Sequence, residues 1–258
     1  VSISVTPPAA NTTTPQARAE TIPTTTTTTT VQVSATPSVA SVVTSVTANR
    51  QASTQPEILV VGGAVVDLIG QISTMTKFGT SNPGKLCVTH GGVGRNIADS
   101  LAKLGRNVSL ATAVADDLNG RSLLESSREK GIDVSLTRVL PTASSPASAH
   151  ATAVYNAIHD GTGDLCIGIA DMDIFSQIDA AYIGTLAKSV EQSKLVAVDG
   201  NLSKEAFGAL ARLCQQLQVP VFFEPTSDHK CLLPFQAGAI DKVKCLFCIW
   251  ILLSHPRK

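Results

Sequence analysis

The sequence has little charge, and it lacks the basic clusters of nucleic-acid-binding proteins. Lys and Arg together number 20, Asp and Glu also number 20, and the net charge is zero. Binding to nucleic acid depends on neutralising phosphates, so this balance argues against a nucleic-acid partner. Long apolar runs are missing too, because residues 245–253 fall well short of the ~20 residues that cross a bilayer. We therefore predict neither a nucleic-acid nor a membrane partner.

Grouped metal ligands are also missing. The six cysteines are dispersed, and the one close pair, Cys245 and Cys248, has no further ligands nearby. We predict no metal site, and buried free thiols in a reducing compartment. No basic segment followed by an apolar one resembles a signal peptide. The expected location is the cytoplasm, with mitochondria and peroxisomes not excluded.

Residues 1–55 differ in composition from the rest of the chain. They are rich in Thr, Ser, Pro, Ala and Val, and Thr24–Thr30 is an unbroken run of threonine. Such a segment has too few large apolar residues to offset the entropy of ordering the chain. We predict a disordered tail or linker. An O-glycosylated stalk is the alternative that this bias allows.

From residue 57 onward, short apolar runs alternate with helical patterns. The expected strands are 58–63, 85–89, 108–114, 132–139, 195–198 and 219–223, and the expected helices are 94–104, 118–130, 180–191 and 203–217. The strands lack polar alternation, which indicates a parallel α/β sheet covered on both faces. Residues 151–170 interrupt this rhythm with a hairpin that turns at 160–164, and we expect it to form a small lid.

Two polar segments follow the first strand. Asp67 comes shortly after it, where ligands bind in open α/β sheets, and its carboxylate can accept hydrogen bonds from two hydroxyl groups. A turn or helix-capping role is the alternative for this residue. The second polar segment is Gly91-Gly92-Val93-Gly94-Arg95-Asn96, whose glycines permit close approach of a ligand to the positive end of a helix. A glycine-rich turn without a ligand explains this segment equally well.

These segments, taken together with Ala115-Asp116-Asp117 and Gly120, resemble the first signature region of the PfkB/ribokinase-like carbohydrate kinases. The stretches at 152–173, 199–202 and 223–227 are similar to the pseudouridine-kinase branch of that family. The resemblance covers about 190 residues, 56–244. It implies a three-layer α/β/α sandwich with a mainly parallel sheet and a small β lid at about 140–172.

The resemblance also implies roles for particular residues. Asp67, Gly91, Gly92 and Asn96 would hold the ribose hydroxyls of a nucleoside or sugar. Asp199 and Asn201 would lie near the transferred phosphate, and a polar turn is the equally weighted alternative for them. In the family, ATP and magnesium support phosphorylation of the 5′-hydroxyl. A fused or partner pseudouridine-phosphate glycosidase and a homodimer are further implications.

Three other polar segments are assigned structural roles. Asp116 and Asp117 are predicted to form a turn or helix start. The segment Asp160–Asp164 superficially resembles the family's catalytic Gly-Ala-Gly-Asp motif, but a strand-like sequence follows it, so we predict a hairpin turn. His229 and Lys230 are predicted to be solvated.

The family's catalytic aspartate and nucleotide-binding motifs have no counterpart in the sequence. The similarity fails near residue 244, and residues 245–258 form an apolar ending unlike a kinase segment. We therefore expect a truncated domain with its C-terminal part missing, no catalytic residue, no competent binding of ATP and no kinase activity. The missing strands would leave an unpaired apolar edge along residues 195–223.

Three alternatives to a pseudouridine-kinase fragment remain. One is a different member of the family that acts on ribose, adenosine or a hexose. Another is a non-catalytic module that binds nucleosides without turnover. The last is a secreted mucin-like protein.

Overall fold

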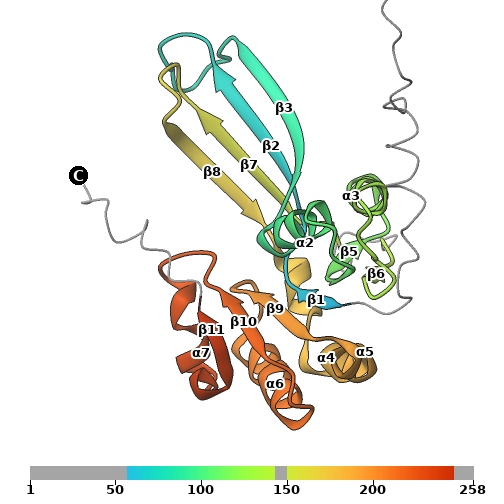
Figure 1. Cartoon of the computed structure of the whole chain (residues 1–258). Helices are drawn as coiled ribbons and strands as arrows, with labels where there is room; N and C mark the ends of the chain where they lie inside the picture. Colours follow the sequence, from blue (N-terminus) through green and yellow to red (C-terminus); the bar gives the residue numbers. More distant parts are fainter. Residues whose placement is uncertain (1–56, 143–149, 247–258) are drawn as a thin grey trace, which may run out of the picture. The chain divides into compact units, whose positions relative to one another are not determined.

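The computed structural model describes residues 57–142 and 150–246, so the predicted tail 1–55 lies outside it, as do residues 247–258 of the predicted tail 245–258. Its main sheet is parallel throughout, with the strand order β11-β10-β9-β1-β4 (Figure 1). The five strands are β1 (Ile58–Val61), β4 (Val108–Ala111), β9 (Leu195–Asp199), β10 (Val221–Glu224) and β11 (Val243–Leu246). The prediction of a parallel α/β sheet is confirmed.

Helices cover both faces of this sheet. On one face, side chains such as Val61, Val198 and Phe223 share an apolar core with α4, α5, α6 and α7. Phe207 of α6 contacts Phe223 edge to face, with 5.3 Å between ring centroids. On the other face, Val60 packs in a second core with α2 and α3. The helices are α2 (Val93–Lys103), α3 (Leu118–Glu129), α4 (Ala180–Thr185), α5 (Ala187–Gln192), α6 (Lys204–Gln216) and α7 (Leu233–Gln236), and the short 3-10 turns are Asp173–Gln177, Lys230–Leu232 and Ile240–Lys242.

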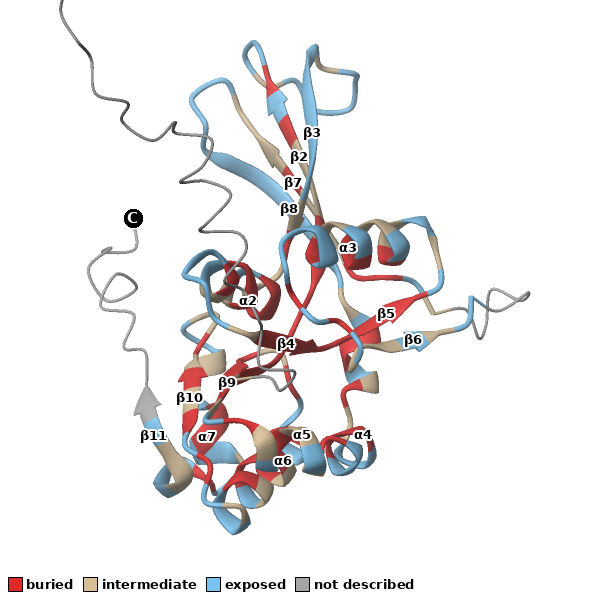
Figure 2. Cartoon of the chain, turned by 45° about the vertical axis from the view of Figure 1, so that its right-hand side comes forward, coloured by how far each residue is buried: buried red, intermediate tan, exposed pale blue. Residues whose placement is uncertain are grey.

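A second sheet forms the lid, and it is larger than the sequence predicted. Its strand order is β3-β2-β7-β8, so the predicted hairpin supplies only half of it. Figure 2 shows that its outer strands, β3 and β8, are exposed, whereas β1, β4 and β9 of the main sheet are largely buried. The four strands are β2 (Val65–Ile72), β3 (Gly84–Gly91), β7 (Val154–His159) and β8 (Leu165–Asp171). Asp67 lies past the first strand, as predicted, and it belongs to β2, a strand that the sequence analysis did not expect.

Several boundaries differ from the predicted ones for local reasons. The expected strand 108–114 is divided at Thr112, where the chain leaves β4 and pairs with a different strand in a two-stranded sheet. That sheet consists of β5 (Ala113–Ala115) and β6 (Arg138–Leu140), so most of the expected strand 132–139 is irregular. The expected helix 180–191 is two short helices that meet at Leu186.

The edge of β10 is paired, contrary to the sequence prediction. β11 runs parallel to β10, with Val221 opposite Val243. β11 thus contributes backbone hydrogen bonds to β10, which reduces the unpaired edge that the sequence analysis predicted. β11 continues to Leu246, two residues past the predicted domain boundary at 244.

Two further findings bear on the sequence predictions. Across 57–142 and 150–246, no helix has the length and apolarity needed to span a membrane. The prediction of buried thiols is wrong for Cys87 and Cys166, which are exposed on β3 and β8, and correct for Cys214 of α6.

Candidate functional site

The site is built where the start of α2 crosses the carboxyl end of β1. Gly92, the residue before α2, has a φ of 92°, and a Cβ there would lie 2.5 Å from the carbonyl oxygen of Gly63. A Cβ on Gly94 would lie 2.8 Å from the carbonyl carbon of Gly62. Only glycine fits such close backbone approaches, so the paired glycines serve to bring the helix start against the strand end.

Asp199, at the end of β9, connects the segment after β1 to the start of α2 through hydrogen bonds. Its Oδ2 accepts hydrogen bonds of 2.8 Å from the backbone N–H groups of both Gly63 and Gly94. Asn201 adds its backbone N–H to Oδ1 and its side-chain amide to Oδ2, each at 2.9 Å. Burial raises the pKa of Asp199, and these hydrogen bonds oppose the rise. Because Asp199 is fully buried, it positions the glycine backbone and has no surface of its own for a phosphate.

Asp67 lies on β2 at the root of the lid. The pairing of β2 with β3 places it opposite Thr89, two residue pairs from Val65 and Gly91, and its carboxylate contacts Gly91. Burial raises the pKa of Asp67, whereas the positive charge of Arg95 acts to lower it. The structure therefore brings Asp67, Gly91 and Gly92 together, as the sequence predicted, and adds a cation beside them.

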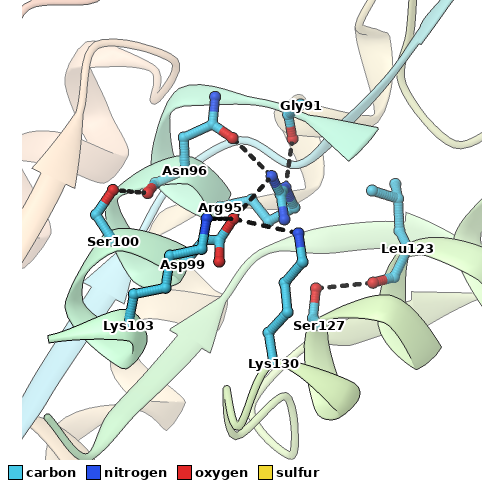
Figure 3. Close-up of polar contacts among 9 residues, drawn as sticks. All are labelled: Gly91, Arg95, Asn96, Asp99, Ser100, Lys103, Leu123, Ser127 and Lys130. Atoms are coloured by element: carbon cyan, nitrogen blue, oxygen red, sulfur yellow. Dashed lines mark hydrogen bonds and ion pairs between the residues drawn. The ribbon is translucent and has the colours of Figure 1, made fainter. Parts of the chain in front are cut away.

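Arg95 is the functional candidate that the sequence analysis missed. Its side chain is buried, with Nε donating to the Gly91 carbonyl at 3.1 Å and Nη2 donating to Asn96 Oδ1 at 2.7 Å (Figure 3). Asp99 lies 3.7 Å from the same guanidinium. A buried arginine is uncommon unless it is paired, and its place between Gly94 and Asn96 of the glycine motif was the available signal.

Asn96 is connected to Asp67 through Arg95. It is exposed on the first turn of α2, where it borders a largely apolar groove of about 710 Å³. Apolar residues of α2, together with Phe222 and Glu224 of β10, line that groove. Arg95 thus interacts with both residues, because its Nη2 donates to Asn96 Oδ1 and its positive charge acts on Asp67.

A second cavity, of about 550 Å³, opens beside Asn201. Lys230 borders it and donates a hydrogen bond of 2.6 Å from Nζ to Asn201 Oδ1. The prediction that Lys230 is solvated is therefore wrong, whereas the side chain of His229 is 89% exposed. The pair provides a cation and an amide at the carboxyl edge of the sheet, which is suited to an anionic group.

The other two polar segments with predicted structural roles behave as expected. Asp117 caps α3, accepting a hydrogen bond of 2.7 Å from the Gly120 N–H. It also accepts from the backbone N–H of Thr152 at 2.8 Å, which ties the base of the lid to α3. The segment Asp160–Asp164 is the turn between β7 and β8, so the catalytic interpretation is excluded for it.

The whole described region matches one protein family. Residues 55–247 match the pattern of the pfkB family carbohydrate kinases. The chain belongs to this family. Its fold agrees with this assignment, because a carbohydrate kinase from Agrobacterium tumefaciens superposes with a TM-score of 0.65, at 27% identity over 74% of this chain and 60% of that one.

Among individual pfkB family members, pseudouridine kinases are prominent. The chain is 34% identical to pseudouridine kinase of Escherichia coli over 68% of its own length and 53% of the relative's. It is 28% identical to pseudouridine kinase of Arabidopsis thaliana, over 67% of this chain and 44% of that one. The chain thus spans about half the length of the curated relatives that it matches.

Kinases of the pfkB family use ATP and magnesium, and the described residues do not supply a complete site for them. Nowhere in 57–142 or 150–246 do three His, Cys, Asp or Glu side chains converge as ligands for a cation. The two carboxylates nearest the carboxyl edge are Asp199, which is consumed by backbone hydrogen bonds, and Glu224, which accepts from Thr226 at 2.8 Å.

Proposed function

We propose that residues 57–246 form the sugar-binding part of a kinase domain that, in complete form, phosphorylates the 5′-hydroxyl of pseudouridine or a related nucleoside. The observation that carries the proposal is the grouping of Asp67, Gly91, Gly92 and Asn96 around Arg95, at the root of a four-stranded lid. A carboxylate and an amide at one strand-to-helix junction suit neighbouring hydroxyls. The 34% identity to a pseudouridine kinase supports the choice of nucleoside.

The division of labour within the site follows from its geometry. Asp67, as a carboxylate, accepts hydrogen bonds from sugar hydroxyls, and the start of α2 adds backbone donors. The lid closes over the sugar and excludes water, which strengthens these contacts. Asn201 and Lys230 form the edge that faces the transferred phosphate. Asp199 acts behind them by holding the backbone of Gly63 and Gly94.

Binding without turnover is the expected behaviour of this chain. Isothermal titration calorimetry of the chain with pseudouridine, adenosine and ribose tests the sugar site, and tightest binding of pseudouridine supports the proposal. An Asp67→Asn variant should lose about tenfold or more in affinity, because one charged hydrogen-bond acceptor is removed. The matched control is Asp164→Asn, at the exposed β7–β8 turn of the lid. Equal binding by wild type and Asp67→Asn would contradict the assignment.

A radiolabelled-phosphate assay tests the second half of the proposal. Because the catalytic aspartate and anion-binding glycines of the family have no counterpart here, we expect no transfer from ATP to pseudouridine. Turnover at a rate typical of kinases, on the order of 1–100 s⁻¹, would overturn this expectation. Nucleoside binding together with absent turnover also fits a non-catalytic binding module, which the same two measurements identify.

Self-association through the lid is the form of homodimer that the structure favours. The pairing of β3 with β2 and of β8 with β7 puts Leu86, Val88, Ile167 and Ile169 on one face of the lid sheet. Each of these side chains is more than half exposed. An apolar patch of this kind marks an interaction surface. Sedimentation of the chain before and after Ile167→Asp tests whether this face joins two copies.

A further inference from the structure

We infer that Arg95 is a positioning residue that fixes Asn96 as a hydrogen-bond donor, and that the site thereby prefers ribose over deoxyribose. This inference rests on the proposed function, since it concerns the same sugar site. The glycine motif alone predicts neither the pairing of Arg95 with Asn96 nor the preference for ribose. It specifies Asn96 without specifying which end of the Asn96 amide faces the ligand.

The orientation of Asn96 follows from the chemistry of its neighbour. A guanidinium has donors and no acceptor, so the atom of Asn96 that faces it must be the oxygen. Nη2 of Arg95 donates to that oxygen at 2.7 Å. Figure 3 shows the consequence: Oδ1 of Asn96 is turned toward Arg95, and the nitrogen points away from it. The outward end of the amide therefore offers two N–H groups.

Arg95 can hold this orientation because it is itself held. Only 3% of the residue is exposed, and its Nε donates to the Gly91 carbonyl at 3.1 Å. On its other side, Asp99 Oδ2 lies 3.7 Å from Nη2 and also receives Lys103 and Lys130, at 3.3 and 3.2 Å. These contacts hold Nε and Nη2 of the guanidinium, whereas Nη1 is buried without a hydrogen-bond partner among the described residues (Figure 3). The Asn96 amide, although exposed, thus inherits a fixed direction.

The same guanidinium influences the glycine pair. In a trans peptide the carbonyl oxygen and the following N–H point to opposite sides. Because the Gly91 carbonyl faces Arg95, the N–H of Gly92 faces away from it. The backbone of Gly92 and the side-chain amide of Asn96 therefore both present N–H donors at the start of α2. The ionised carboxylate of Asp67 on β2 can only accept hydrogen bonds.

This division of donors and acceptors matches a pair of neighbouring hydroxyls. One hydroxyl donates to Asp67, and the oxygen of the other accepts from Asn96. A 2′-deoxy sugar lacks one of the two, so either a half-buried carboxylate or a fixed N–H loses its partner. Sites that are built to bond a hydroxyl discriminate strongly against ligands that lack it.

The competing explanation is that Arg95 merely ties β3 to α2. Removing a purely structural contact between β3 and α2 would weaken the binding of every sugar by a similar factor. Removing the orientation of Asn96 would instead reduce the ratio of ribose to deoxyribose affinity. The ratio is therefore the measurement that separates a positioning residue from a structural one.

The experiment is calorimetric titration of the chain with pseudouridine and 2′-deoxypseudouridine, for wild type, Arg95→Met, Asn96→Ala and the double variant. We expect wild type to prefer the ribose form by at least about tenfold, and each single variant by less than about threefold. The double variant should show no further loss, because Arg95 acts through Asn96. Lys103→Met is the matched control, since it removes a different cation from Asp99, and should keep the wild-type ratio.

A second variant protects the test against misfolding of Arg95→Met. Asn96→Asp retains an oxygen for Arg95 but replaces the outward N–H groups with an acceptor, so the ribose preference should disappear while the melting temperature stays near that of wild type. A wild-type ratio in either folded variant would overturn the inference. Failure of wild type to bind any ribonucleoside would instead overturn the proposed function, and this inference with it.

Discussion

The carboxylate of Asp67 lies against Gly91, in the space that a side chain at position 91 would occupy. The two residues belong to adjacent antiparallel strands, β2 and β3, and they are far apart in the sequence. The glycine thus has a function beyond backbone freedom, because it makes room for a charged group beside the start of α2. This relationship predicts different consequences for substitutions at the two adjacent glycines.

Gly91→Ala should weaken nucleoside binding more than it weakens the fold. The atom that a new methyl group would meet is the end of a flexible side chain, so Asp67 can move aside at a cost of about 1 kcal/mol or less. Displacing its carboxylate should lower affinity about tenfold. Calorimetry and urea denaturation of the same variant measure both effects.

Gly92→Ala is the contrasting variant. Its φ of 92° disfavours any other residue, and its new methyl group would meet the backbone of Gly63 at 2.5 Å. Backbone atoms cannot move aside as a side chain does, so we expect destabilisation of about 2 kcal/mol or more in urea. Equal stability of the two variants would contradict this account of the junction.

Nucleoside affinity should depend on pH through Asp67. Burial raises the pKa of this carboxyl above its ordinary value of 3.8, and the charge of Arg95 limits the rise. The ionised form accepts the sugar hydroxyls, so affinity should be constant near neutral pH and fall on acidification through a midpoint above 3.8. Arg95→Met should move that midpoint further up. Calorimetry across a pH series measures it, and an Asp67→Asn variant should show no such midpoint.

Asp117 should contribute strongly to stability, in contrast to its neighbour. It caps α3 and also satisfies the backbone N–H of Thr152, so Asp117→Ala should cost about 2–3 kcal/mol in urea denaturation. Asp116→Ala is the matched control. Its carboxylate makes one ion pair, with Arg121, in which both side chains are more than half exposed, so its loss should cost less than about 1 kcal/mol.

The contribution of Asp117 should also have a defined pH dependence. Burial acts to raise its pKa, but hydrogen bonds from Thr152 and Gly120 outweigh this and lower it below 3.8. A depressed pKa means that the stabilisation is complete above the unfolded-state value and is lost as the pH falls through the folded-state value. Asp117→Asn should remove this part of the acid dependence. An unchanged acid transition would contradict the assignment.

Cysteine reactivity should separate the lid from the core. Cys87 and Cys166 are exposed, so a thiol reagent should modify them within minutes in the native protein. Cys214 is buried in α6, and burial raises the pKa of its thiol to about 12. We expect it to react only after unfolding. Peptide mass spectrometry of partially labelled protein identifies the order, and early modification of Cys214 would contradict the packing of α6.

The parts of the fold that sequence analysis predicted well depend on local patterns. The apolar run of β1, the glycines around α2 and the hairpin turn at 160–164 each carry their signal within a few residues. β2 was missed because it contains Asp67 and Gly70, which interrupt the apolar pattern that indicates a strand. Its partners are supplied by distant segments, so the extent of the lid is a property of pairing and not of local sequence.

The candidate site was predicted residue by residue but not as a network. The glycine motif indicated Gly91, Gly92 and Asn96 from their types and spacing. Arg95 stands within the same motif and its partners Gly91 and Asn96 are local, but residue type and spacing did not indicate that its side chain is buried and turned toward them. Lys230 was misassigned for a different reason, because its partner Asn201 is 29 positions away. Such long-range partners are set by topology, which spacing along the chain does not encode.

The hydrogen bonds of Asp199 have a consequence for the order of events during synthesis. The groups that it holds, the amides of Gly63 and Gly94, precede it by 136 and 105 residues. A nascent chain can form the glycine junction early, yet the junction stays without its buried acceptor until β9 has left the ribosome. Contacts of this range slow folding. The ligand pocket should therefore mature late on the ribosome, after most of the domain has emerged.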